Sequence, residues 1–100
     1  MSEQLNFEDF SKHVNTKFKV YRTDEEIFDA ELVGVYDLRN DHVLQTFAVE
    51  FLLPREFGNE QRIHKIEHPE LGTMELFIVP VEQRESGIRY EAIFNRLLLK

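Results

Sequence analysis

The sequence pattern that most resembles a metal site is a pair of histidines four residues apart, His64 and His68, with Glu67 and Glu70 nearby. On a helix, side chains at this spacing lie on one face and can share an ion. The surrounding residues alternate between polar and apolar types, which predicts a strand, and four residues of strand span about 13 Å. Two ligands that each lie about 2 Å from one zinc ion cannot be so far apart. We therefore predict no metal and no cofactor. We expect surface histidines, or in the case of His68 an anchor for the following turn.

Glu50 is the acid with the most suggestive setting for catalysis, because it stands in the apolar run of residues 47–51. A carboxyl group enclosed in an apolar barrel has a raised pKa and can act as a general acid or base. Strand alternation places Glu50 on the outward face instead, and we favour that interpretation. Neither Ser11 nor Ser86 stands in a strand-to-helix elbow, and the glycines form no phosphate-binding loop. The sequence therefore predicts no catalytic residue and a protein that is not an enzyme.

Net charge and composition limit the classes of partner that we expect for this chain. The formal net charge is −7, from 19 acidic and 12 basic residues, which argues against nucleic acid and anionic membranes as partners. Residues 17–22 interleave cations with aromatic rings, as a face for single-stranded nucleic acid does, but the net acidity favours a solvated outer face. The absence of cysteine excludes disulfides and thiolate chemistry. We find no signal-peptide pattern and no long apolar span, so we expect cytoplasmic synthesis without membrane insertion and predict no final location.

The elements that position these groups are mainly strands. Residues 62–95 predict a three-stranded meander, with a proline and glycine turn at His68–Gly72 and a second turn at Glu85–Gly87. A short helix over about residues 6–14, capped by Asn6, precedes the strands. The predicted strands cover residues 16–22, 27–38, 45–53, 62–68, 73–79 and 88–95. The sequence predicts a single all-β domain over residues 1–100, with about six antiparallel strands in a small barrel or sandwich and one short N-terminal helix.

Strand alternation also predicts an interior. In the second strand, one face should carry Phe28, Ala30, Leu32, Gly34, Tyr36 and Leu38, and Gly34 suggests a bulge or bend. The predicted barrel interior is lined by five aromatic rings, Phe28, Phe47, Phe51, Phe77 and Phe94. This lining gives an alternative hypothesis, a barrel that binds a small apolar ligand. Small barrels usually fill their interiors with side chains, so we place this hypothesis second.

Several stretches resemble a family of short bacterial proteins that carry a domain of unknown function. The resemblance rests on six segments, Phe7–Phe10, Phe18–Val20, Glu31–Val35, His68–Gly72, Glu75–Val81 and Tyr90–Asn95. It covers nearly the whole chain up to Asn95. Proteins of this kind stand near genes that resemble phage-tail or tail-fibre genes. The resemblance implies an accessory or structural part of such an assembly, and it carries over no catalytic residue.

The apolar tail over residues 96–100 is the feature with the clearest link to a partner. Leu97, Leu98 and Leu99 either pack on the body as an extension of the last strand or dock onto another subunit. An apolar strand end is a template for strand addition. Phe57, in the loop after the third strand, is a further interaction candidate. We predict a non-enzymatic structural or interaction domain whose partner is a protein. It forms a homo-oligomer or docks onto a larger tail-like or fibre-like assembly.

Overall fold

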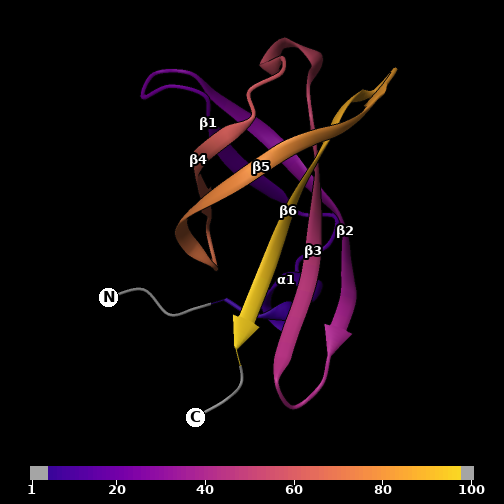
Figure 1. Ribbon diagram of the computed structural model, residues 1–100. Helices are drawn as coiled ribbons and strands as arrows, with labels where there is room; N and C mark the ends of the chain where they lie inside the picture. Colours follow the sequence, from indigo (N-terminus) through magenta and orange to yellow (C-terminus); the bar gives the residue numbers. More distant parts are fainter. Residues whose placement is uncertain (1–4, 98–100) are drawn as a thin grey trace.

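A computed structural model describes residues 5–97, which form a closed antiparallel barrel with a short helix beside it (Figure 1). Around the barrel the strands run in the order β1-β2-β3-β6-β5-β4. The elements are α1 (Phe7–Ser11), β1 (Lys17–Tyr21), β2 (Ile27–Asn40), β3 (Leu44–Leu53), a 3₁₀ turn η1 (Arg55–Phe57), β4 (Arg62–His68), β5 (Gly72–Arg84) and β6 (Gly87–Leu97). The predicted all-β class with one short helix is confirmed, and of the two architectures the chain adopts the barrel. Within residues 5–97, the helical segments are all too short or too polar to cross a membrane.

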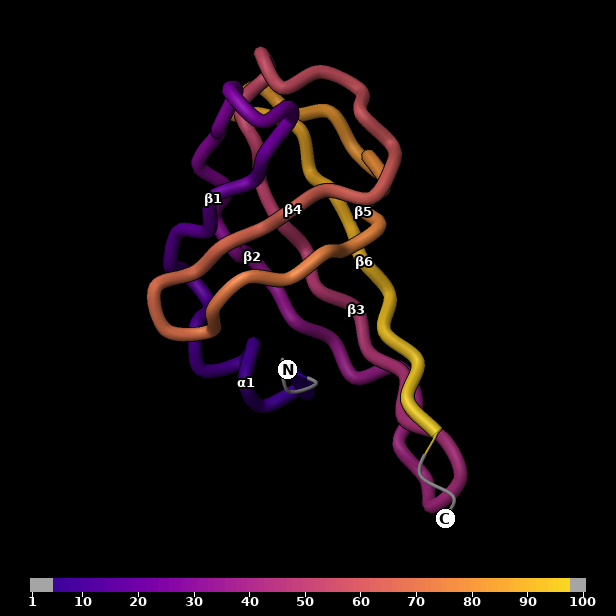
Figure 2. The backbone as a smooth tube through the Cα atoms, turned by 90° about the vertical axis from the view of Figure 1, so that its left-hand side faces the viewer, coloured from indigo at the N-terminus to yellow at the C-terminus, as the bar shows by residue number. Residues whose placement is uncertain are grey.

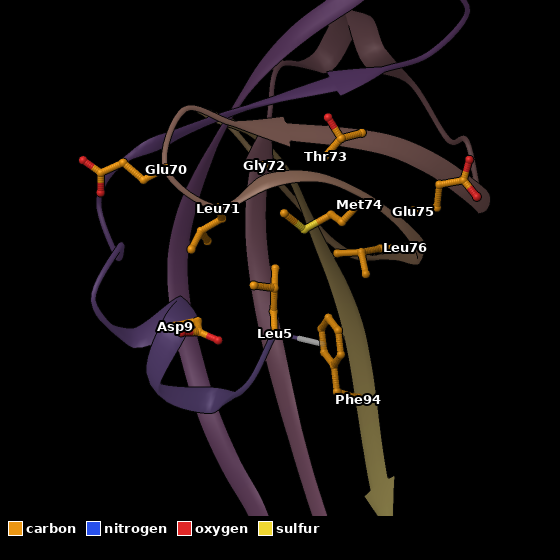
Figure 3. A pocket seen from close by; sticks show the side chains of 10 residues that line it. All are labelled: Leu5, Asp9, Glu70, Leu71, Gly72, Thr73, Met74, Glu75, Leu76 and Phe94. Atoms are coloured by element: carbon orange, nitrogen blue, oxygen red, sulfur yellow. The ribbon is translucent and has the colours of Figure 1, made fainter. Parts of the chain in front are cut away.

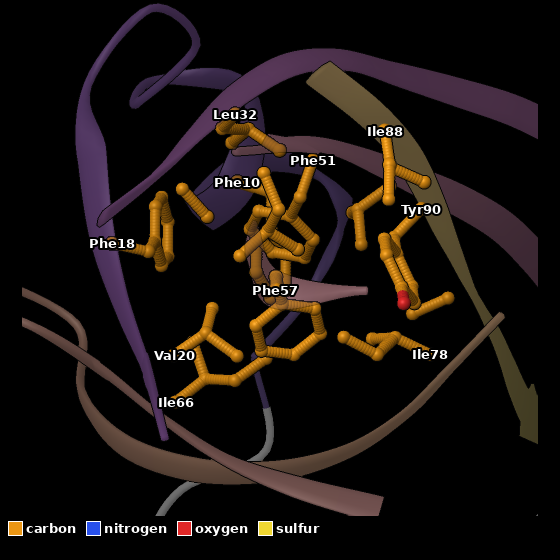
Figure 4. Close-up of a cluster of buried hydrophobic side chains, with 14 of the residues drawn as sticks. Phe10, Phe18, Val20, Leu32, Phe51, Phe57, Ile66, Ile78, Ile88 and Tyr90 are labelled. Carbon is orange, nitrogen blue, oxygen red and sulfur yellow. The ribbon is translucent and has the colours of Figure 1, made fainter. Parts of the chain in front are cut away.

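The barrel interior is packed with aromatic and aliphatic side chains (Figure 4). Phe18 meets Phe51 edge to face with ring centroids 5.2 Å apart, and Phe57 meets Tyr90 in the same way at 5.3 Å. Phe77 does not join them, which corrects the predicted lining. Alternation along β5 turns Phe77 outward, where it is 52% exposed. A ligand inside the barrel would have to displace the packed rings.

Helix α1 closes one end of the core. Asn6 caps it as predicted, because its side chain accepts from the Asp9 N–H at 2.9 Å and the Asp9 carboxylate accepts from the Asn6 N–H at 2.8 Å. Phe10 is fully buried, with its ring centroid 5.3 Å from that of Phe94. The helix ends at Ser11, earlier than predicted, because the chain turns before β1 and Asn15 takes a left-handed φ of 73°.

A bulge in β2 reverses the predicted faces of its second half. The pairing register with β3 shifts between Leu32 and Gly34, which confirms the predicted irregularity at this glycine. After the shift Val35 packs on the core, whereas Tyr36 and Leu38 point outward and are 48% and 57% exposed. The prediction that these two residues share the inner face with Leu32 is therefore wrong. One inserted residue moves every following side chain to the opposite face.

Strand β5 changes partner at Pro80, so that its two parts pair with different strands. Residues 72–78 pair with β4, whereas residues 79–84 pair with β6, with an irregular register beside Pro80. Proline lacks the N–H that a regular ladder needs, and a bulge tolerates it. The predicted strand ended at residue 79, but the chain continues through Pro80 by this exchange of partners. Residues 72–78 of β5, which precede Pro80, diverge from residues 92–97 of β6 (Figure 2).

The diverging strands leave a three-stranded sheet extension, which consists of residues 34–40 of β2, 44–49 of β3 and 92–97 of β6. It runs away from the barrel with β6 along one side (Figure 2). In this extension β2 and β6 each pair only with β3, so within residues 5–97 both outer edges lack a strand partner. The extension contributes to an elongated shape with principal extents of 42 × 29 × 23 Å.

Candidate functional site

The two histidines that suggested a metal have separate structural roles. His64 is buried, which corrects the expectation of a surface residue. Its Nδ1 lies 2.8 Å from the carbonyl oxygen of Tyr21 and its Nε2 lies 2.7 Å from that of Glu60. Both partners are carbonyl oxygens, which accept a hydrogen bond from a ring N–H. The ring thereby ties β1 to the loop before β4. Residues 5–97 contain no group of three or more potential ligands that could hold a metal ion.

His68 anchors the turn that follows it, as predicted. Its Nδ1 accepts from the backbone N–H groups of Glu70 and Leu71, at 3.1 and 3.3 Å. Its Nε2 lies 3.0 Å from the Thr16 hydroxyl, which donates to the carbonyl oxygen of His13 at 2.6 Å. This pattern requires a neutral ring with its proton on Nε2. Burial lowers the pKa of His68, and the nearby charge of His13 lowers it further.

His13 has a partner that is distant in sequence. Its Nδ1–H donates to the carbonyl oxygen of Asp9 at 2.8 Å, and its Nε2–H donates to the Glu70 carboxylate at 2.7 Å. The hydrogen bond to the Asp9 backbone raises the pKa of His13 most, followed by the bond to Glu70. The bond from His13 in turn lowers the pKa of Glu70. This ion pair holds the end of α1 against the turn between β4 and β5.

We expect His13 and His68 to titrate in opposite directions from the ordinary histidine value of 6.5. His13 should protonate above that value and His68 below it. The stabilisation from His13 is present below its unfolded pKa and is lost as the pH rises through its folded pKa. The stabilisation from His68 is present above its unfolded pKa and is lost as the pH falls through its folded pKa. NMR titration of the two imidazole rings measures both values.

A Glu70→Gln variant is the control for this titration. It should bring the His13 pKa back toward 6.5, because the side-chain partner loses its charge. If His13 titrates below His68 in the unaltered chain, the assigned hydrogen-bond pattern is wrong.

Glu50 lies on the outward face, as favoured from strand alternation. Its carboxylate pairs with the Arg89 guanidinium, which also donates through Nε to Glu82 at 2.9 Å. Glu82 also accepts from Arg84 Nε at 2.8 Å. The result is a chain of alternating charges across β3, β6 and β5. This arrangement gives Glu50 a role in holding neighbouring strands together.

Leu97 is the tail residue that the structure describes, and it is 70% exposed at the end of β6. It pairs in register with Leu44 and lies on the outer face of the sheet extension. Strand β6 extends to Leu97 as the first alternative expected, but this residue does not pack on the body, and docking onto another subunit stays a prediction. Leu98 and Leu99 lie outside the described residues.

Phe57 is not available as an interaction residue, which corrects that prediction. It is fully buried, and its ring lies against Phe28, His64 and Tyr90. The Tyr90 hydroxyl helps to hold this loop, because it donates to the carbonyl oxygen of Gly58 and accepts from the Glu60 N–H at 2.8 Å. The short 3₁₀ turn η1 folds the ring of Phe57 into the barrel mouth.

A groove of about 610 Å³ opens where β5 and β6 diverge (Figure 3). Its apolar lining comes from the segment before α1, the β4–β5 turn, β5 and β6, and consists of Leu5, Leu71, Met74, Leu76 and Phe94. Three acids, Asp9, Glu70 and Glu75, also line it, together with Gly72 and Thr73. We call this feature the β5–β6 groove. Along it, residues 72–78 of β5 and 92–97 of β6 each lack a second strand partner.

A family model for a domain of unknown function, DUF6916, matches residues 5–94 of the chain. The chain belongs to the DUF6916 family. This finding confirms the predicted membership of a family of unknown function, whereas the bacterial and phage-tail setting stays a prediction. Comparisons with curated proteins and with solved structures find no match. The DUF6916 match spans the barrel and every residue that lines the β5–β6 groove.

The groove of this DUF6916 chain could not be found by local sequence patterns. Leu5 and Phe94 stand at opposite ends of the chain and meet across the groove because the barrel closes. Pro80 is the local signal that was available, since it marks where β5 leaves one partner for another. The three leucines of the tail were noticed from the sequence, whereas the groove was not predicted.

Proposed function

We propose that the chain is a non-enzymatic protein-interaction domain that associates through the open edge of its sheet extension. The observation that carries this proposal is the unpaired edge of β6 over residues 92–97. A free strand edge offers a row of backbone donors and acceptors to a strand of another chain. Proteins normally protect such edges with charges, proline or a covering element.

The side chains near this edge favour association as well. Ile93 is 48% exposed, and it pairs in register with Ala48, which pairs with Tyr36 on the other side. Ala48 is only 2% exposed although it lies outside the core cluster, so its neighbours on the outer face cover it. With Leu38 and Leu97, these residues place exposed apolar side chains next to the open edge, on either side of a polar row that consists of Arg39, Thr46 and Asn95. Exposed apolar groups of this kind are typical of contact surfaces.

The partner in this proposal is a second copy of the chain or a larger tail-like or fibre-like assembly. The resemblance to short bacterial proteins near phage-tail genes supports the second setting. Strand addition suits both, because an open edge can pair with an identical chain or with a different one. The alternative, a barrel that binds a small apolar ligand, is disfavoured by the tightly packed interior.

We expect an Ile93→Lys substitution to weaken self-association by about tenfold or more. The change removes apolar area from the contact and places a charge beside the edge, and about 1.4 kcal/mol corresponds to a factor of ten. Sedimentation equilibrium of the variant and the unaltered chain measures the effect.

Ile27→Lys is the matched control, because Ile27 is 46% exposed and lies in the part of β2 that pairs with β1, away from the sheet extension. Equal weakening by both substitutions would contradict a contact at the β6 edge.

A further inference from the structure

We infer that the β5–β6 groove receives the segment Leu97–Lys100 of a second copy of the chain. The inference rests on the proposed self-association and adds the two surfaces that meet. One is the groove, with apolar walls and acidic residues at its border. The other is a segment of three leucines followed by a lysine, which begins at the end of β6.

Both surfaces carry apolar side chains that a contact could cover. Leu5, Leu76 and Phe94 turn toward a common space in the groove (Figure 3). The three residues are only partly buried. Each therefore keeps apolar surface that a bound leucine can cover. Covering apolar surface contributes roughly 25 cal/mol per Å² before the costs of association. Leu97, at 70% exposed, is the described residue of the segment and has the most such surface to lose.

The charges are also complementary. Asp9, Glu70 and Glu75 line the groove, and the segment carries Lys100. Glu70 is already paired with His13, whereas among the ion pairs of residues 5–97 neither Asp9 nor Glu75 has a cationic partner. Glu75 can therefore attract a lysine from another chain, whereas the Asp9 carboxylate already accepts a hydrogen bond from the Asn6 N–H and adds only its negative charge. Such attraction selects a partner and an orientation more than it adds affinity.

The direction of β6 favours a segment that comes from another copy. Phe94 lines the groove, and β6 continues past it to Leu97 (Figure 3). To enter its own groove the chain would have to reverse immediately after Leu97. A neighbouring copy can present the segment to the groove without such a reversal, so we assign the occupant to a neighbour.

Bound in this way, the segment lies between the free edges of β5 and β6 and can add to one of them as a strand. The donating surface and the receiving surface are different, so the contact is head to tail. Two copies can exchange segments and close as a pair, or successive copies can continue as a chain.

The test compares the intact chain with a chain that ends at Leu97, by sedimentation equilibrium. We expect removal of residues 98–100 to weaken self-association by at least tenfold and to leave the fold unchanged. Leu97→Asp should have a similar effect. Ile63→Asp is the matched control, since Ile63 is 61% exposed on β4 and lies outside both the groove lining and the sheet extension.

A mixing experiment identifies the receiving surface. A Leu76→Lys chain has an altered groove and an intact segment, whereas the chain that ends at Leu97 has the reverse. Neither should associate alone, and the mixture should form a one-to-one complex. The NMR signals of Leu71, Met74 and Phe94 in the shortened chain should shift on mixing. If Leu76→Lys fails to fold, Glu75→Lys replaces it, because Glu75 is exposed.

The outcomes separate the two claims. An intact chain that associates equally well without residues 98–100 overturns the groove inference and leaves self-association standing. Failure of the mixture to associate, when both chains are folded, also overturns the groove inference. An intact chain that stays monomeric overturns self-association and the groove inference together.

Discussion

Replacing Phe10 by alanine is expected to lower the free energy of unfolding by about 3–5 kcal/mol. Phe10 is fully buried, and its ring packs against Phe18, Phe47 and Phe94. Removing the ring loses its burial and leaves a cavity that the surrounding strands cannot fill. Domains of this size are stable by only about 5–15 kcal/mol, so the loss is a large share of the total. Urea denaturation followed by circular dichroism measures it.

The effect reaches beyond the core, because Phe10 attaches a helix that is too short to stand alone. Helix α1 contains five residues, and isolated helices need roughly 12–15 to persist in water. Loss of Phe10 should therefore free α1 and disturb the nearby groove wall at Leu5 and Asp9.

Phe77→Ala is the matched control for this prediction. The same atoms are removed from a side chain that is 52% exposed, so we expect a change within about 0.5 kcal/mol. Similar losses at Phe10 and Phe77 would contradict the packing described for α1.

Replacing Gly87 by alanine is expected to destabilise the fold by about 3 kcal/mol or more. Gly87 begins β6 with a φ of 150°, a conformation that residues with a side chain rarely adopt. An added Cβ would also press against the carbonyl oxygen of Leu53 in β3. Backbone atoms cannot rotate away as a side chain can, so β3 and β6 would have to separate where their pairing begins. The midpoint of thermal unfolding gives the effect.

Gly72→Ala separates the two contributions. Gly72 has a φ of 86°, and an added Cβ would meet nothing within 4 Å. We therefore expect only the conformational cost, about 1–2 kcal/mol. If Gly87→Ala costs no more than Gly72→Ala, the close approach of β3 and β6 at Gly87 is not as described.

The local features of the chain could be predicted because they depend on nearby residues. The cap at Asn6 and the turn anchored by His68 both follow from hydrogen bonds over three or fewer residues. Glu50 was placed outward by alternation alone. The strand β4 began and ended where expected, because Pro69 stops it and polar residues precede it.

The errors have a common cause, which is that long-range packing changed a local pattern. The register shift after Leu32 reversed the faces of β2, and the alternation of Tyr36 and Leu38 does not indicate such a shift. The partner of His13 is Glu70, which closure of the barrel brings to it. The buried position of His64 depends on carbonyl groups of a different strand and a loop. Periodicity describes one strand at a time and cannot supply these contacts.

The same distinction applies to the candidate site. The three leucines of the tail are visible in the sequence as an apolar run, so a docking segment could be predicted. The groove that we pair with them is built from three separate parts of the chain, residues 5–9, 70–76 and 94, and exists only because β5 lies apart from β6 before Val79. Local sequence patterns do not predict that Asp9, Glu70 and Glu75 line one groove.

Sedimentation equilibrium of the intact chain over a wide concentration range tests self-association most directly. The chain has a mass of 12.0 kDa. We predict an apparent mass that rises with concentration to that of a dimer or a larger assembly, and that falls back when Ile93 is replaced by lysine. A mass of 12.0 kDa at every concentration would contradict the account.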